Sequence, residues 1–270
     1  MVIKAQQDID GAYAAAQCVV RTHERLVEYL AAGRTLGEID RFVAEVLSSL
    51  DCKSAFLRYQ MKGHPPFASH ACLSLNDCIV HGTHDMSEKP VGIGDVLSVD
   101  IGVIHDGWIG DAAWTYAIGE ASDEALQLMS CGRESLRRGI ASVKAGQPLL
   151  EWAKALQPYV EGECGFHLVR GLGGHGYGRQ LHGPPFISNV TPVYAGEWPD
   201  AFDTFKPGML LAVEPMIAVG SSDIVSKRRK WPIYTADGSL SVHYEADILV
   251  TDNGARNLTE GMEKLPDVIG

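Results

Sequence analysis

The sequence lacks any apolar run long enough to cross a membrane, since a spanning helix needs about 20 mostly apolar residues. Its first ten residues carry charged side chains and no apolar core of the kind found in secretion signals. We therefore expect no membrane partner and a cytoplasmic location.

Basic charge is also scarce in this chain. There are 23 lysines and arginines against 34 aspartates and glutamates, which gives a net charge of −11. An acidic surface repels phosphates, so a direct nucleic-acid partner is not expected. The one basic run, Lys227–Lys230, is interpreted as a solvated turn, with substrate or ribosome contact as the alternative.

The cysteines lack the Cys-x-x-Cys spacing that is typical of zinc and redox motifs. The six are scattered along the chain: Cys18, Cys52, Cys72, Cys78, Cys131 and Cys164. A chain of this length can bury roughly 70–75% of its unfolded surface without covalent staples. We expect reduced, mostly buried thiols.

What the sequence does contain is a weak internal duplication. The segment Gly94–Asp100 recurs as Gly208–Glu214, and the Ala-Gly pair at 32–33 recurs at 145–146 with nearly the same offset. Each half reads as two helices followed by strands. These observations predict an α+β fold with pseudo-twofold halves, residues 1–120 and 121–270, within a single domain of residues 1–270.

Helix signals support this division. Thr35 and Glu38 form a capping box before a helical apolar pattern, and Pro148 suits the first turn of a helix running through Val160. A longer helix is expected before each of these, over residues 12–30 and 122–140.

A hairpin is predicted to bring two carboxylates together. Apolar residues alternate from position 97 to 104, and Asp106-Gly107 is a strong two-residue turn signal. This turn sets Gly102 opposite Asp111. Asp100 and Asp111 then share one face of the hairpin, diagonally across the ladder.

Two further acids occupy similar places in the second half. Glu214 stands where the repeat has Asp100, and Glu245 alternates with apolar neighbours on the opposite face of its predicted strand. Converging carboxylates repel one another unless cations neutralise them, and two divalent ions would do so. His175 adds a nitrogen ligand, which suits a transition metal. Each residue alone would more often be a solvated acid or a hydrogen-bonded surface histidine.

The segment Gly171–Gly176 formally matches a dinucleotide-binding fingerprint. We reject this match because Pro184-Pro185 follows and no βαβ pattern surrounds it. The glycines are instead interpreted as allowing the backbone of this loop to pass close to a metal and a substrate.

With these residues assembled, the chain resembles the bacterial type I methionine aminopeptidases along nearly its whole length. The matching segments are Ser74–Gly82, Val99–Asp111, Gly174–Gly176, Glu214–Met216 and Tyr244–Gly254. The resemblance implies the pita-bread fold, with duplicated halves around a curved antiparallel sheet. It also implies a cytoplasmic, monomeric enzyme that removes N-terminal methionine from nascent or short peptides, with the ribosome as a candidate partner.

The resemblance further implies a role for each site residue. Asp100 would bind one of two divalent metal ions, Asp111 and Glu245 would bridge both, and His175 and Glu214 would complete the other site. The ions would be cobalt, manganese, iron or zinc. Glu214 would accept a proton from metal-activated water. His81 would lie near the substrate amine, and His182 would polarise the scissile carbonyl.

The substrate pocket is the place where the chain departs from the family. Ile109, Gly183 and Ala246 stand where the family commonly has His, Glu and His. Cys72 and Trp231 occupy positions that look like the apolar methionine pocket, although either could be a core residue. The alternatives are another pita-bread hydrolase acting on Xaa-Pro or specialised peptides, and a catalytically silent binding protein with this fold.

Overall fold

The two helices of the first half form as the capping signals predict. A computed structural model describes residues 1–194 and 196–270. Helix α1 (Gln6–Tyr29) packs beside α2 (Leu36–Ser49). The predicted capping box is confirmed: the Thr35 hydroxyl accepts from the Glu38 amide at 3.2 Å, and the Glu38 carboxylate accepts from the Thr35 amide at 2.8 Å. Helix α1 begins earlier than predicted because its first turn is polar and lies outside the apolar pattern.

The second pair of helices differs from the expectation at one point. Helix α3 (Asp123–Ser142) begins after Ser122, whose hydroxyl accepts from the Ala125 amide. Helix α4 (Leu150–Gln157) does not continue as an α-helix through Val160, and the prediction was wrong there. The chain passes instead into a π-helical turn, Pro158–Glu163, because a proline has no N–H to donate within the α-helical ladder.

The first sheet is built on the predicted hairpin of β4 (Val96–His105) and β5 (Trp108–Ile118). Gly102 pairs with Asp111 and His105 with Trp108, which confirms the predicted register. Three short strands complete this sheet along the outer edges of the hairpin: β1 (Lys53–Ser54), β2 (Cys72–Leu75) and β16 (Val268–Ile269).

The second half forms a sheet of its own in the order β15-β14-β9-β7-β8. Its strands are β7 (Gly173–Gly176), β8 (Gly183–Ser188), β9 (Leu210–Val213), β14 (Ala246–Thr251) and β15 (Gly254–Asn257). There are two smaller sheets. One contains β6 (His167–Leu168), β10 (Met216–Ala218) and β13 (Ser241–His243). The other contains β3 (Cys78–Val80), β11 (Ile224–Ser226) and β12 (Ile233–Thr235). The strand expected through residues 242–250 is therefore interrupted between β13 and β14.

The interruption leaves the register unchanged. Val213 pairs with Ala246 before the gap and Met216 pairs with His243 after it. Glu214 therefore lies opposite Glu245 within the gap. The Glu245 amide donates to the Ala113 carbonyl of β5 at 2.9 Å, so this point also joins the second sheet to the first.

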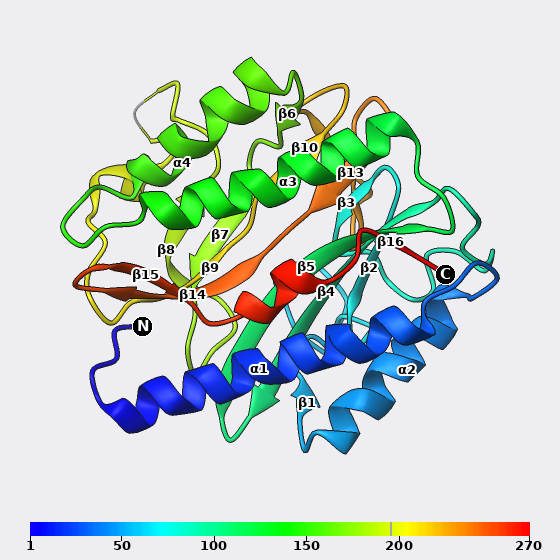
Figure 1. Ribbon diagram of the computed structural model, residues 1–270, viewed down its shortest axis with the longest axis horizontal. Coiled ribbons are helices and arrows are strands. Elements are labelled where there is room, and N and C mark those ends of the chain that lie inside the picture. The colour runs from blue at the N-terminus through cyan, green and yellow to red at the C-terminus, as the bar shows by residue number, and fades with distance from the viewer. Residues whose placement is uncertain (195) are drawn as a thin grey trace.

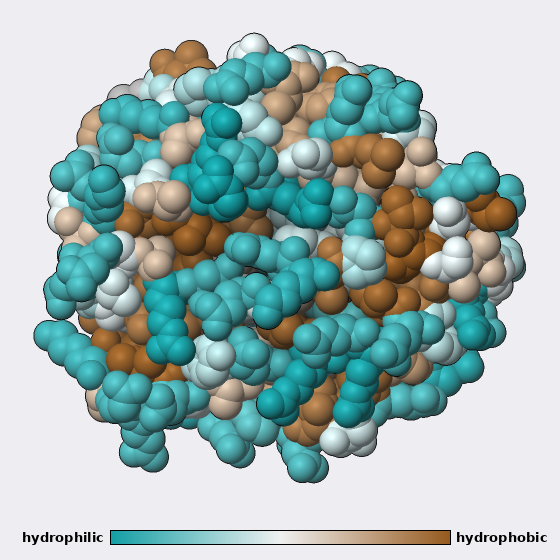
Figure 2. Space-filling view, in the orientation of Figure 1, coloured by the Kyte–Doolittle hydropathy of each residue, from teal (hydrophilic) through white to brown (hydrophobic). Residues whose placement is uncertain are grey.

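The helices lie together on one side of the sheets (Figure 1). Helix α1 packs against β4 and β5, and α3 packs against β10, β13 and β15. Hydrophilic side chains cover much of the outer helical face (Figure 2). The main cluster of buried apolar side chains extends from Ile3 to Ile269 and draws on both halves. The α+β class predicted from the sequence is confirmed.

Within the residues that the structure describes, no helix is both long enough and apolar enough to cross a membrane.

Candidate metal centre and substrate pocket

The β4–β5 hairpin places Asp100 and Asp111 on the face turned away from helix α1. Gly110, next to Asp111, faces the helix so closely that an added Cβ would lie 2.5 Å from the Ala15 backbone. Because side chains alternate along a strand, Asp111 points to the other side. Both carboxyl groups are buried, and each has one oxygen (Oδ1) without a hydrogen-bond partner.

Glu214 and Glu245 come from the gap between paired strands. The Glu214 carbonyl accepts from the Asn189 side-chain amide at 2.8 Å, and Asn189 is itself held by the Trp152 indole at 3.0 Å. Glu245 is held through its amide by β5. Buried contacts thus fix both main chains at the place where ladder pairing stops.

His175 lies in strand β7, not in the loop expected from its glycine neighbours. Its Nε2 is 3.9 Å from Asp111 Oδ2. An added Cβ at Gly174 would lie 2.3 Å from the Ala212 carbonyl oxygen of β9, and one at Gly176 would lie 2.2 Å from the Pro184 carbonyl oxygen. Gly174 and Gly176 therefore allow close approach to neighbouring strands, while Gly171 and Gly173 line the cavity.

His243 is a site residue that the sequence reasoning missed. Its side chain is buried, and its Nε2 lies 3.0 Å from Glu214 Oε2 and 4.0 Å from Glu245 Oε2. A signal was available, because His243 and Glu245 are two residues apart in a strand-like pattern and so share a face. Asp247 was also missed; its Oδ2 accepts from the Asp111 amide at 2.8 Å.

Two further histidines, both named from the sequence, line the same pocket. His182 Nδ1 is 2.8 Å from the Tyr59 hydroxyl, and its ring centroid is 4.3 Å from that of His175. His81 has a φ of 59° and lies beside Trp231. Burial lowers the pKa of His81 to about 4, and burial also lowers the pKa of His182. Both rings are therefore neutral near pH 7. Tyr59 had no signal in the sequence because its loop has no periodic pattern.

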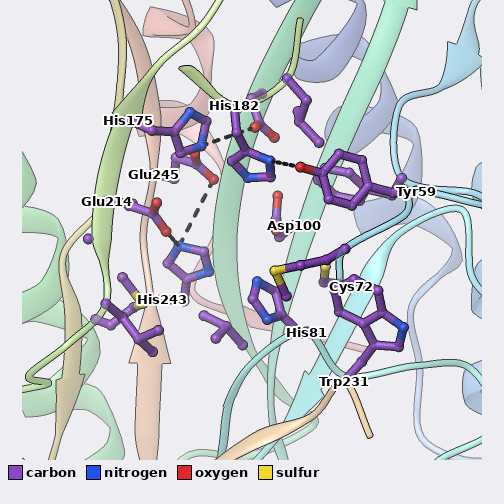
Figure 3. Close-up of a pocket in the computed structure, with 18 of the residues that line it drawn as sticks. Tyr59, Cys72, His81, Asp100, His175, His182, Glu214, Trp231, His243 and Glu245 are labelled. Carbon is purple, nitrogen blue, oxygen red and sulfur yellow. Dashed lines mark hydrogen bonds and ion pairs between the residues drawn. The ribbon is translucent and has the colours of Figure 1, made fainter. Parts of the chain in front are cut away.

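The pocket is a cavity of about 450 Å³ that opens beside the acids. Glu214, Glu245, His175, His182 and His243 gather at one end, and His81 lies with Cys72 and Trp231 at the other (Figure 3). The Trp231 indole N–H donates to the Pro65 carbonyl at 2.9 Å, which holds the ring edge-on to Phe67. The remaining apolar lining comes from Phe56, Tyr59, Met61, Val80, Leu172, Leu181, Phe186 and Met216.

The carboxyl groups strongly disfavour ionisation in the absence of cations. Burial raises the pKa of Asp100 to about 7, and burial followed by the charge of Asp100 raises the pKa of Asp111 well above its usual range. Burial, followed by the charge of Asp111, raises the pKa of Glu245 well above its usual range. Burial also raises the pKa of Glu214. Buried acids with unpartnered oxygens fit divalent cations, which would supply both the missing ligands and the opposite charge.

The ligand atoms fall into two groups that share one residue. Asp111, His175 and Glu245 form one group, and Glu214, His243 and Glu245 form the other, with all atoms of a group within 4.8 Å of one another. Asp100 lies beside them in the pocket (Figure 3). The structure thus gathers all nine site residues named from the sequence around one cavity.

A cavity that joins paired carboxylates and imidazoles to an apolar recess defines a metal-dependent hydrolase site. Residues 10–252 match the model of metallopeptidase family M24, and the chain belongs to that family. It is 33% identical over 259 residues to methionine aminopeptidase 1 of Bacillus subtilis (strain 168), covering 96% of this chain and 99% of that protein. It is 36% identical over 256 residues to methionine aminopeptidase 1 of Mycobacterium tuberculosis (strain CDC 1551 / Oshkosh), covering 93% and 92%.

Solved structures agree with this assignment. Methionine aminopeptidase from Thermotoga maritima superposes with a TM-score of 0.85 at 34% identity, over 96% of this chain and 99% of that one. X-Pro aminopeptidase from Thermotoga maritima MSB8 shares the fold, with a TM-score of 0.74 at 21% identity over 99% of this chain and 63% of that one. The pita-bread fold expected from the sequence is confirmed.

Proposed function

We propose that this chain is a metal-dependent aminopeptidase that removes N-terminal methionine from peptides by metal-activated water. The observation that carries the proposal is the cavity with acids and imidazoles at one end and an apolar recess at the other. The methionine aminopeptidases to which the chain is similar over almost its whole length support the same reaction.

The metal centre of this proposal consists of two divalent ions. Glu245 belongs to the same group as Asp111 and His175 and also to the same group as Glu214, so it would contact both of two neighbouring ions. Asp100, Asp111, His175 and Glu214 are the other proposed ligands, and cobalt, manganese, iron or zinc would suit this mixed donor set. When bound, the ions lower the pKa of water and polarise the scissile carbonyl.

Glu214 is the proposed proton acceptor. The Nε2–H of His243, 3.0 Å away, donates to one of its carboxylate oxygens and fixes the group in place. The other oxygen is then free to take a proton from the attacking water.

His182 is the proposed partner of the scissile carbonyl. With the Tyr59 hydroxyl donating to Nδ1, the neutral ring carries its proton on Nε2. That N–H can donate to the carbonyl oxygen as negative charge develops there. His81, neutral and close to Trp231, can accept a hydrogen bond from the substrate amine.

The apolar recess is the proposed methionine pocket. Trp231, Phe67 and Cys72 offer an aromatic and sulfur-containing wall, and thioether sulfur interacts favourably with aromatic rings. We further propose that the enzyme is monomeric and acts in the cytoplasm on nascent or short peptides, with the ribosome as a candidate partner.

The test is hydrolysis of the peptide Met-Ala-Ser by enzyme that has been stripped of metal with a chelator and then supplied with cobalt, manganese, iron or zinc. We expect metal-restored release of methionine by the wild-type chain and none by Glu214→Ala. An Xaa-Pro peptide is tested in parallel, because other pita-bread hydrolases act on Xaa-Pro bonds. Cleavage of that peptide with no methionine release, or metal binding with no hydrolysis of either peptide, would contradict the proposal.

A further inference from the structure

Two thiols and an imidazole meet at a second place in the molecule. Cys18 comes from helix α1, Cys52 follows helix α2, and His105 ends strand β4. One ligand atom of each lies within 4.8 Å of those of the other two. Both thiols are buried, with exposed fractions of 5% and 7%, whereas the His105 side chain is 25% exposed.

We propose that Cys18, Cys52 and His105 bind a single thiophilic transition-metal ion, with zinc as the representative. Two thiolates and one imidazole form a donor set that zinc favours. Water would occupy the fourth position on the side where His105 reaches solvent.

The distance between Cys52 and His105 agrees with tetrahedral coordination. Zinc–sulfur bonds of about 2.3 Å and zinc–nitrogen bonds of about 2.0–2.1 Å set a tetrahedral sulfur–nitrogen separation of about 3.5 Å. Cys52 Sγ lies 3.6 Å from His105 Nδ1. These two atoms could hold an ion where they stand, and Cys18 Sγ, within 4.8 Å of both, is near enough to complete the set.

The second nitrogen of His105 faces away from the thiols. Its Nε2 lies 3.8 Å from the Asp106 carboxylate, on the opposite edge of the ring from Cys52. The Nε2 side of the ring is therefore the side that is open to solvent, and Nδ1 is the atom that faces Cys52.

The cluster is separate from the peptidase pocket. The described residues that line the pocket include none of these three side chains. His105 lies five residues beyond Asp100 along β4, which is about 17 Å in an extended strand. An ion there would tie helix α1 and the segment after α2 to the tip of the hairpin whose strands carry Asp100 and Asp111.

The test uses the full-length chain with its thiols reduced and its metal removed by a chelator. The chain is then titrated with cobalt as a spectroscopic probe. We expect a thiolate-to-cobalt charge-transfer band in the wild type and its loss in Cys18→Ser and Cys52→Ser. The band should persist in Cys131→Ser, which alters a buried thiol elsewhere. It should also persist in Cys72→Ser, which removes the thiol of the peptidase pocket.

A second measurement needs no substitution and remains valid if a variant fails to fold. Alkylation of each cysteine in the wild-type chain is followed by peptide mass spectrometry with and without zinc. Zinc should slow alkylation of Cys18 and Cys52 at least 10-fold and leave Cys131 unchanged. Equal protection of all three thiols, a charge-transfer band that depends only on Cys72, or a Cys18–Cys52 disulfide that forms without metal uptake would overturn the proposal.

Discussion

Gly174 offers a direct test of how the sheet positions the metal centre. The variant Gly174→Ala adds one methyl group, and its carbon would lie 2.3 Å from the Ala212 carbonyl oxygen. That distance falls 1.1 Å short of the 3.4 Å at which ordinary contact begins. The obstructing atom is backbone, so strand β7 must move away from β9.

The movement separates two proposed ligands. His175 follows Gly174 on β7, and Glu214 follows β9 directly. Overpacking of this kind costs typically about 1–3 kcal/mol, so the protein should remain folded. A misplacement of about 1 Å at reacting groups can lower the rate about 100-fold. We therefore expect kcat/KM on Met-Ala-Ser to fall about 100-fold, together with weaker metal binding.

The assay combines steady-state kinetics, metal titration and circular dichroism. Gly37→Ala is the control, because it adds the same methyl group in helix α2, away from the pocket, where no heavy atom lies within 4 Å. This control should keep kcat/KM within a few-fold of the wild type. Wild-type kinetics and metal affinity in folded Gly174→Ala would refute the argument that β7 packing positions His175.

Three further predictions concern Tyr59 and His243 at the site and His23 in the core. Tyr59→Phe should lower kcat about 10-fold with little change in KM, because it removes one hydrogen bond to His182 and keeps the aromatic ring beside Trp231; an equal loss through KM would indicate a substrate contact instead. His243→Ala should weaken metal binding about 10- to 100-fold in a calorimetric titration, and His243→Gln should recover part of this loss; unchanged affinity in both would exclude a role for His243. Burial lowers the folded-state pKa of His23 from 6.5 to about 3, so the unfolded chain takes up its proton first as the pH falls. The contribution of His23 to stability is therefore complete above pH 6.5 and should decline by about 2 kcal/mol on going to pH 5. Urea unfolding of His23→Phe should lack this part of the pH dependence, and an identical slope in both proteins would contradict the assignment.

The sequence was sufficient for the elements that rest on local signals. The capping box at Thr35, the turn at Asp106-Gly107 and the alternation around Asp100 each depend on neighbouring residues, and each was confirmed. The π-helical turn was missed because the apolar positions of α4 continue through Val160. Periodicity alone did not show that Pro158 would break the ladder.

The parts of the site that were missed depend on long-range packing. Tyr59 reaches His182 from 123 positions away, and nothing near Tyr59 marks it as a site residue. The strand contacts of the glycines around His175 were missed for the same reason. A glycine signals close approach, but only the fold shows that Ala212 is the group approached.

The gap between the paired strands of the second half explains why His243 belongs to the site. Pro215 has no N–H, so the ladder between β9–β10 and β13–β14 cannot be completed beside Glu214. The register is the same on both sides of the gap, which sets Glu214 opposite Glu245 and keeps His243 on the same face two residues away. The Glu245 amide is satisfied by Ala113 of the first sheet. The acids therefore converge where main-chain pairing is interrupted, and His243 supplies the hydrogen bond that Glu214 would otherwise lack.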